Sequence, residues 1–449
     1  MPTEMPHVVI VGAGFGGVSA TEELAKEGFR VTLLDRFPYN TFQPLLYQVA
    51  TGGLNPGDVT YRLRNFAAQH ESVRFRWAEV VGIDHDRQEV ICDDGARISF
   101  DYLIIGNGIT TNHFGIPGAA KYTMSMYTRA EAIRVRDTIF GSLEIIARAG
   151  EPDSGFTVVI VGGGPTGVEM AGQLAELRTK AMPRTFPELN SARAHVVLVE
   201  MLPHLLAPFD DSLRKYALQE LLKRGVDVRL NTAISEVHAD RVDFKDGSSM
   251  PVDVVIWAAG VSGDPQVKEW GLPIGRAGRI EINDDTRVVG EERIFAIGDA
   301  GVSVDKPLPQ LAQPAIQMGK FAARQIARLH RGLDTQTFHY HDKGTMATIG
   351  RGDAVLQMPA GLKLTGVLAW LGWIVLHIAY LLGGRNRVQT LINLGSRYLI
   401  PRRGSAIVGD VLETHKLRAL RAREAEEVTA RQNQEMGAQQ DQAMRAQEA

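Results

Sequence analysis

The chain has 449 residues, enough for about three domains at roughly 150 residues per domain. Hydrophobic residues make up 44% and charged residues 22%, as in ordinary globular proteins. A net charge of -3 gives no electrostatic basis for binding nucleic acid, and the single cysteine, Cys92, excludes internal disulfides, redox-active cysteine pairs, iron–sulfur clusters and cysteine-ligated zinc. We expect no metal centre, and we interpret Cys92 as a small apolar residue of a strand.

The N-terminal residues 1–7 lead directly into an apolar strand. They have no basic region, no apolar signal segment and no cleavage site of the kind found in secretory signals. We therefore expect a protein that lies in the cytosol or faces it.

Two apolar runs end in glycine-rich turns that precede helical patterns. The first set is residues 8–11, 12–17 and 19–26, and the second is residues 157–161, 162–167 and 168–179. A strand, a glycine turn and a helix form the opening of a dinucleotide-binding βαβ unit. One such motif alone is weak evidence, but here the similarity continues along the chain.

The two units repeat at nearly equal length. Gly108 follows Gly12, and Gly260 follows Gly162, after similar strand-turn-strand patterns. We therefore predict an α/β protein with two tandem Rossmann-like dinucleotide-binding domains, plus a C-terminal amphipathic helical region that anchors the protein to a membrane. The expected boundaries are residues 1–115 with 280–350 for the first domain, 116–279 for the second, 351–411 for the C-terminal region and 412–449 for a tail.

An acid ends the second strand of each unit. Asp35 follows residues 30–34, and Glu200 follows residues 194–199. In dinucleotide-binding domains an acid about 20 residues after the loop accepts hydrogen bonds from a ribose hydroxyl. A carboxylate also repels a 2'-phosphate, and no arginine follows Glu200 in residues 201–204. We therefore expect NADH to be preferred over NADPH.

The C-terminal part has a different character. Residues 354–409 contain no Asp or Glu and six basic residues, and residues 364–384 carry no charge. A run of about 20 such residues can span a bilayer. Thr365, Gly366, Gly372 and His377 dilute it, however, and the apolar pattern continues past Arg385, so we favour helices lying in one leaflet over a transmembrane span or a soluble interface. We expect the tail after Val411 to be a fraying helix or disordered.

Several motifs make the resemblance to a known family specific. They are FQPLLYQVATG (42–52), Gly298-Asp299, LAQPAIQ (311–317), and AWLGW (369–373) with His377 and Tyr380. The chain closely resembles the type II NADH dehydrogenases, monotopic NADH:quinone oxidoreductases of the two-dinucleotide-binding-domain flavoprotein superfamily. The likeness covers residues 7–410.

The resemblance implies a tightly but non-covalently bound FAD in the first unit and NADH as co-substrate in the second. The implied FAD residues are Gly12, Gly14, Phe15, Gly16, Gly17, Asp35, Arg36, Pro44, Leu45, Val80, Gly108, Asp299, Ala312 and Gln313. The implied NADH residues are Gly162, Gly164, Pro165, Thr166, Gly167, Glu169, Glu200, Ala259 and Gly260. The implied catalytic residues are Glu169, between the nicotinamide and flavin sites, and Gln313 and Gln317, on the quinone side of the flavin.

We therefore expect hydride transfer from NADH to FAD and then two-electron reduction of a membrane quinone, menaquinone or ubiquinone, without proton translocation. The expected location is the cytoplasmic face of the cell membrane, with contacts to anionic lipid and as a homodimer. Two alternatives remain open. One is a soluble NADH-dependent reductase of a small redox protein or of oxygen, and the other is a slow-turnover NADH-sensing flavoprotein.

Overall fold

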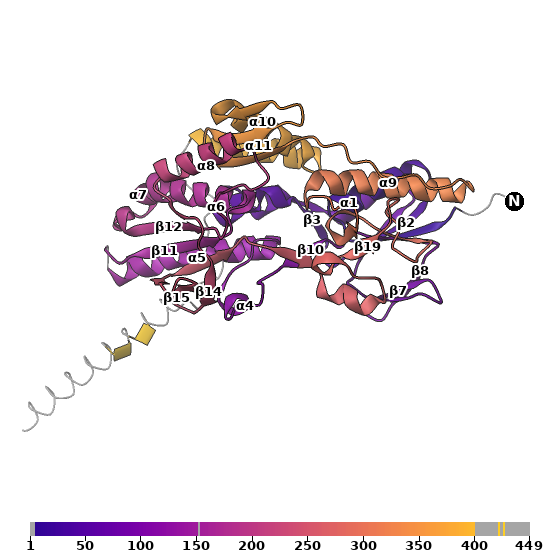
Figure 1. The fold of residues 1–449 in the computed structure, drawn as a ribbon, viewed down its shortest axis with the longest axis horizontal. Coiled ribbons are helices and arrows are strands. Elements are labelled where there is room, and N and C mark those ends of the chain that lie inside the picture. Colours follow the sequence, from indigo (N-terminus) through magenta and orange to yellow (C-terminus); the bar gives the residue numbers. More distant parts are fainter. Residues whose placement is uncertain (1–4, 151–152, 400–420, 423–424, 427–449) are drawn as a thin grey trace, which may run out of the picture.

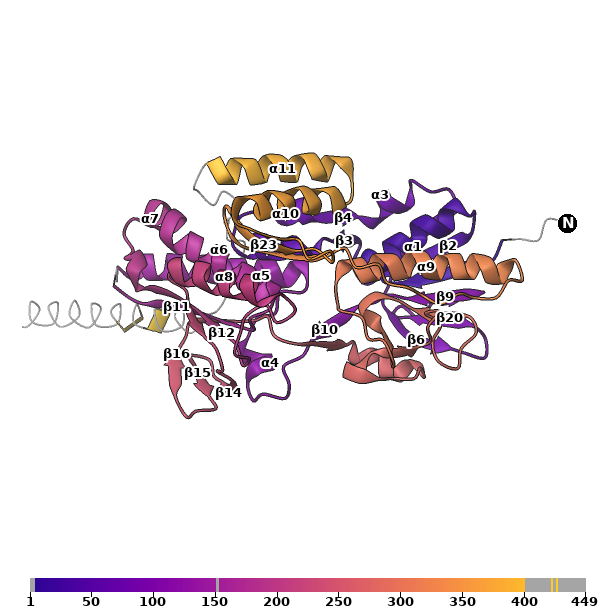
Figure 2. The same ribbon diagram turned by 45° about the horizontal axis from the view of Figure 1, so that its top comes forward.

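A computed structural model describes residues 5–150, 153–399, 421–422 and 425–426. Two α/β domains lie side by side, with the C-terminal helices across one face of the molecule (Figure 1; Figure 2). The predictions for residues 400–411, and for most of the tail from residue 412, concern positions outside the described residues.

The first domain contains a parallel sheet in the order β20-β9-β1-β2-β5. Its strands are β1 (His7–Val11), β2 (Arg30–Asp35), β5 (Val73–Trp77), β9 (Tyr102–Ile105) and β20 (Ile294–Ala296). Helix α1 (Phe15–Lys26) starts inside the glycine turn, earlier than the expected residue 19, and packs on α9 (Ala312–His330). The strand predictions for this domain are confirmed, since its Val- and Ile-rich runs are buried on both faces.

The second domain repeats this plan with a parallel sheet in the order β13-β12-β11-β17. Its strands are β11 (Phe156–Val161), β12 (Ala194–Val199), β13 (Asp227–Arg229) and β17 (Val254–Trp257). Its helices are α5 (Arg129–Ala149), α6 (Pro165–Glu176) and α8 (Asp211–Lys223). The predicted duplication is confirmed, because strand, glycine turn, helix and acid-ending strand recur in the same order.

Each domain also has a three-stranded antiparallel sheet. The strands are β6 (Val80–Asp84), β7 (Glu89–Cys92) and β8 (Arg97–Ser99) in the first domain, and β14 (Ile234–Val237), β15 (Arg241–Phe244) and β16 (Ser249–Pro251) in the second. Cys92 is buried in β7, as predicted. Strands β10 (Ile109–Thr111) and β18 (Val261–Gly263) pair with each other where the chain passes between the domains. Shorter elements are β3 (Tyr39–Thr41), α2 (Leu46–Ala50), β4 (Thr60–Arg62), α3 (Leu63–Ala67), α4 (Ala119–Tyr122), α7 (Met182–Thr185), β19 (Ile280–Ile282) and β21 (Gly301–Ser303).

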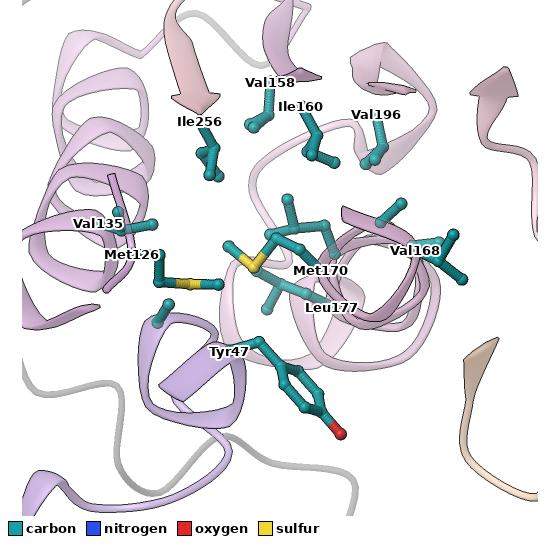
Figure 3. Close-up of a cluster of buried hydrophobic side chains, with 14 of the residues drawn as sticks. Tyr47, Met126, Val135, Val158, Ile160, Val168, Met170, Leu177, Val196 and Ile256 are labelled. Carbon is teal, nitrogen blue, oxygen red and sulfur yellow. The ribbon is translucent and has the colours of Figure 1, made fainter. Parts of the chain in front are cut away.

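One buried apolar cluster joins the second domain to α2 of the first. Figure 3 shows Met126 and Met170 between Tyr47 of α2 and Ile256 of β17. The flexible methionine side chains fill the space between the helix and the sheet. The same cluster includes Trp373, so the C-terminal region belongs to this core and is not a detached appendage.

The C-terminal region starts with an antiparallel sheet of β22 (Thr345–Gly350), β23 (Asp353–Gln357) and β24 (Lys363–Thr365). Strand β22 lies within residues 280–350, assigned above to the first domain, yet it packs on α6 of the second. The uncharged run 364–384 is divided among β24, α10 (Gly366–Tyr380) and a turn at Gly383 (φ +80°) before α11 (Gly384–Leu399). Among the described residues, no helix is long and apolar enough to cross a membrane.

Candidate active site

A cavity of about 600 Å³ runs from the first glycine loop to helix α10 and receives side chains from both domains. The predicted residues that line it are Gly12, Gly14, Phe15, Gly16, Asp35, Arg36, Pro44, Val80, Gly108, Pro165, Thr166, Glu169, Gly260, Asp299, Ala312 and Gln313. The predicted residues outside its lining are Gly17, Leu45, Gly162, Gly164, Gly167, Glu200, Ala259 and Gln317. The structure therefore brings most of the expected FAD residues to one cavity with Glu169.

The two glycine loops have matching constraints. Gly12 has φ +96°, and a Cβ atom there would lie 2.3 Å from the carbonyl oxygen of Gly106. A Cβ atom at Gly17 would lie 1.8 Å from the carbonyl oxygen of Gly12, as one at Gly167 would from that of Gly162. Only glycine allows helix and strand to approach so closely. The helix N-termini that follow offer free N–H groups to a pyrophosphate.

Asp35 is held at the end of β2 by two backbone N–H groups. Ala13 N donates to Oδ2 and Phe37 N donates to Oδ1, each at 2.7 Å. Burial raises the pKa of Asp35 above its usual range, and the two N–H donors act in the opposite direction. A carboxylate can accept about four hydrogen bonds, so acceptor capacity remains for ribose hydroxyls.

Asp299 lies in a 3-10 turn after β20, where the chain reaches the cavity. Burial raises its pKa to about 6, while the guanidinium of Arg279 favours the ionised form. Arg279 donates to the backbone carbonyls of Asp299 (2.7 Å) and Gly298 (3.3 Å), and so fixes this turn. Sequence reasoning missed Arg279, because it lies far from the Gly-Asp element in the chain and carries no motif.

Glu169 lies in the first turns of α6 and faces the C-terminal sheet. The backbone N–H of Thr348 in β22 donates to Oε1 at 3.3 Å. Burial raises the pKa of Glu169 to about 8, against the opposing effects of that N–H and of Trp373. The hydroxyl of Thr348 is in turn hydrogen-bonded to that of Tyr47 at 3.1 Å, which fixes β22 against α2. At neutral pH this carboxyl group is mainly protonated and can donate a proton or a hydrogen bond.

The two glutamines of α9 have different environments. Gln313 lines the cavity, and its buried Oε1 has no hydrogen-bond partner among the described residues. Gln317 instead forms two hydrogen bonds with the backbone of His341, donating to its carbonyl oxygen at 2.9 Å and accepting from its N–H at 3.0 Å. Gln313 is therefore available to a ligand in the cavity, whereas Gln317 fixes the segment before β22.

Pro44 and Leu45, adjacent in the chain, also have different environments. Pro44 lines the cavity, while Leu45 is fully buried in the apolar cluster with Trp373. Helix α10 contributes Leu376, His377 and Tyr380 to the lining. The sequence motifs included His377 and Tyr380 without a role, and Leu376 lay outside them. The cavity therefore extends from the first glycine loop to the C-terminal helices.

The cavity fits a flavin dinucleotide on features of this structure. The glycine loop leaves room for a pyrophosphate at the start of α1, and a Cβ atom at Gly14 would meet nothing within 4 Å. Two polar atoms that line or adjoin the cavity, Asn107 Oδ1 and Gln313 Oε1, are buried without partners among the described residues. Buried polar atoms are usually paired, so these atoms fit a ligand that donates hydrogen bonds.

Comparison with known proteins agrees with this arrangement. Residues 6–319 match the family described as pyridine nucleotide-disulphide oxidoreductase. A Mycobacterium tuberculosis protein named type II NADH:quinone oxidoreductase NdhA is 34% identical over 94% of this chain and 93% of its own. A Staphylococcus aureus protein named type II NADH:quinone oxidoreductase is 29% identical over 79% of this chain and 90% of its own. The structure of NDH2 from Plasmodium falciparum in complex with NADH has a TM-score of 0.82 and 20% identity, over 88% of this chain and 99% of that one.

Proposed function

We propose that this chain, which belongs to the type II NADH:quinone oxidoreductases within the pyridine nucleotide-disulphide oxidoreductase family, uses FAD to oxidise NADH and reduce a membrane quinone without translocating protons. The observation that carries the proposal is the single cavity lined by Asp35 and Asp299 of the first domain, Glu169 of the second, and Gln313 of α9. It allows an electron donor and an acceptor to reach one redox group.

The first domain would hold FAD. Gly12, Gly14 and Gly17 would lie at the pyrophosphate, Asp35 would accept from the adenosine ribose, and Asp299 would accept from the ribityl hydroxyls. When bound, the flavin can take up a hydride and release two electrons to a second substrate.

The second domain would hold NADH through Gly162, Gly164 and Gly167 at the pyrophosphate. Glu200 would accept from the ribose hydroxyls, with Oε2 and Oε1 already fixed by the N–H groups of Gly163 (2.6 Å) and Leu202 (2.8 Å). The cavity reaches Pro165, Thr166 and Gly260, so the nicotinamide would enter there.

Near the reacting atoms, Glu169 would supply a proton. Its raised pKa keeps it protonated at neutral pH, and its contact with Thr348 of β22 fixes its position in the cavity lining. Quinone reduction consumes protons, so an acid with a pKa near the working pH is well suited to this step. Gln313 would hold a quinone oxygen with its neutral amide.

The quinone would reach the cavity from the membrane, where α10 and α11 lie side by side (Figure 2). The exposed apolar side chains on these helices are Val367, Leu368, Leu371, Val375, Leu376, Val388, Leu391 and Ile392. Arg385 and Arg387 are exposed beside them and would attract anionic lipid. We propose that the protein is a homodimer bound monotopically to the cytoplasmic face of the membrane.

Anaerobic flavin absorbance tests the proposal. NADH should bleach the flavin of the purified protein rapidly, NADPH should bleach it slowly, and a short-chain quinone should restore the absorbance of the bleached protein. Bleaching without recovery would favour an NADH sensor or a reductase of another acceptor. A protein purified without flavin, and unable to bind added FAD, would contradict the assignment of the first glycine loop.

A further inference from the structure

His377 is a buried histidine whose side chain lines the same cavity as Gln313. It lies on α10, one turn after Trp373, at the end of the cavity next to the exposed apolar helices. The quinone is proposed to enter the cavity at this end, but His377 has no role in the function proposed above.

Contacts on several sides fix the orientation of the ring. Nδ1 lies 2.7 Å from the backbone carbonyl oxygen of Trp373. The indole of Trp373 stacks on the imidazole, with ring centroids 3.9 Å apart and an interplanar angle of 21°. Phe42 approaches at 90°, with its centroid 6.1 Å away. A side chain held in this way loses little further freedom when a ligand binds.

The same contacts define which nitrogen can serve a ligand. A carbonyl oxygen only accepts, so Nδ1 carries the proton and Nε2 presents a lone pair. Burial lowers the pKa of His377 to about 4, so the ring is neutral at pH 7. Nε2 has no hydrogen-bond partner among the described residues, and the ring borders the cavity.

Building on the proposed function, we propose that Nε2 of His377 accepts a hydrogen bond from a hydroxyl group of the quinol, the reduced form of the acceptor. A quinol has two hydroxyl donors, whereas the oxygens of a quinone only accept. The lone pair of Nε2 therefore offers nothing to the oxidised substrate. His377 distinguishes the two forms and favours the product that the reaction generates.

Gln313 differs in this respect, because its amide can both donate and accept. It can serve quinone and quinol equally, so the selectivity for the reduced form resides in His377. Removing a neutral hydrogen bond of this kind changes affinity about threefold to tenfold. The expected effect is thus on quinol binding alone.

The test compares His377→Phe and His377→Gln with the unsubstituted protein, FAD-loaded and in detergent, using a short-chain quinone and its quinol. We expect His377→Phe to weaken product inhibition by quinol about threefold to tenfold. Its KM for quinone and its bleaching by NADH should stay within about twofold of the unsubstituted values. His377→Gln retains an acceptor, Oε1, the same number of bonds from the backbone as Nε2, and should restore part of the inhibition.

Thr390→Val is the matched control. Thr390 is also buried in the C-terminal helices, but it donates to the carbonyl oxygen of Asp58 and does not line the cavity, so quinol inhibition should not change. Equal losses of quinone and quinol binding in His377→Phe would show a packing role and overturn the proposal, as would unchanged quinol inhibition. Failure of the unsubstituted protein to reduce quinone would overturn the proposed function, and this inference with it.

Discussion

Asp35 and Glu200 occupy equivalent positions in the two domains. Each carboxylate accepts one hydrogen bond from the N–H of the second residue of its glycine loop, Ala13 or Gly163. Each accepts another from the N–H of the residue two positions after the acid itself. The duplication thus extends from strand order to individual hydrogen bonds. In each domain two backbone N–H groups thus fix the carboxylate that we propose accepts hydrogen bonds from a ribose.

The first prediction follows from this equivalence. Glu200→Ala should raise the KM for NADH by about tenfold or more, because hydrogen bonds to a charged group are worth about 1.5–3 kcal/mol. The ratio of kcat/KM for NADH to that for NADPH should fall in this variant, because the carboxylate that repels the 2'-phosphate is gone. The flavin content should stay unchanged. Steady-state kinetics with both nucleotides check this, with Glu188→Ala, a change at an exposed acid of the same domain, as control. Loss of flavin, or an unchanged KM for NADH, would contradict the assignment.

The second prediction concerns pH and Glu169, whose pKa is raised to about 8 from the usual 4.5. Between these values the folded chain binds a proton that the unfolded chain has released, so the free energy of unfolding falls steadily as the pH rises from 4.5 to about 8 and levels off above it. Glu169→Gln has no such loss. Relative to the unsubstituted protein, it should become more stable by about 3 kcal/mol between pH 5 and 8.

Thermal unfolding across this pH range measures the difference for Glu169. The matched control is Glu188→Gln, a change at an exposed acid of the same domain, which should leave the pH dependence of stability unchanged. A constant difference between Glu169→Gln and the unsubstituted protein would mean that Glu169 is ionised throughout the range. Its role as a proton donor would then be lost.

The sequence predicted the features that depend on local backbone constraints. The glycine loops, the buried parallel strands and the acids that end them are each encoded within a few residues, because close approach and a positive φ require glycine at fixed positions. The i and i+4 spacing of Gln313 and Gln317 likewise indicated a shared helical side, but it could not show that the backbone of His341 binds the second amide.

Contacts between segments far apart in the chain were beyond sequence reasoning. Thr348 reaches Glu169 because β22 packs on α6, where a Cβ atom at Gly172 would lie 2.0 Å from the carbonyl oxygen of Ile349. Arg279 reaches the carbonyl oxygens around Asp299 in the same way. Such contacts leave no periodic pattern in the sequence, because a single residue from each of the two segments is enough to form them. The repeated order of strand, glycine turn and helix could therefore be predicted, but not the contacts that hold Glu169 and Asp299 in place.

The third prediction concerns the membrane. Leu368 and Val375 are each 69% exposed on α10, and burying an apolar side chain of this size is worth about 1.5–3 kcal/mol. Replacing both with serine should weaken binding to anionic vesicles at least tenfold, while reduction of a short-chain quinone in detergent persists. Vesicle sedimentation checks this. Leu333→Ser, a change at an exposed leucine beyond the end of α9, is the control. Unchanged sedimentation of the double variant would rule out α10 as the membrane contact.

The last prediction concerns the close helix packing beside the cavity that we propose holds FAD. A Cβ atom at Gly319 of α9 would lie 2.2 Å from the carbonyl oxygen of Gly16 in α1. Neither atom could move away by rotation of a side chain, because the Cβ is bonded to the backbone and the oxygen is part of it. Gly319→Ala must therefore separate the two helices, with a loss of about 2 kcal/mol or more in the free energy of unfolding. Because Gly16 and Gln313 lie on these helices and line the cavity, flavin should also be lost more readily on dilution.

Gly372→Ala provides the opposite case, because a Cβ atom at this position inside α10 meets nothing within 4 Å. That substitution should stabilise the protein by up to about 1 kcal/mol through helix propensity alone. Melting temperature and flavin-to-protein ratio, measured for both variants, separate the two effects. If Gly319→Ala retained flavin and melted like Gly372→Ala, the spacing of α1 and α9 would not determine the geometry of the cavity. The glycine at 319 would then need another explanation.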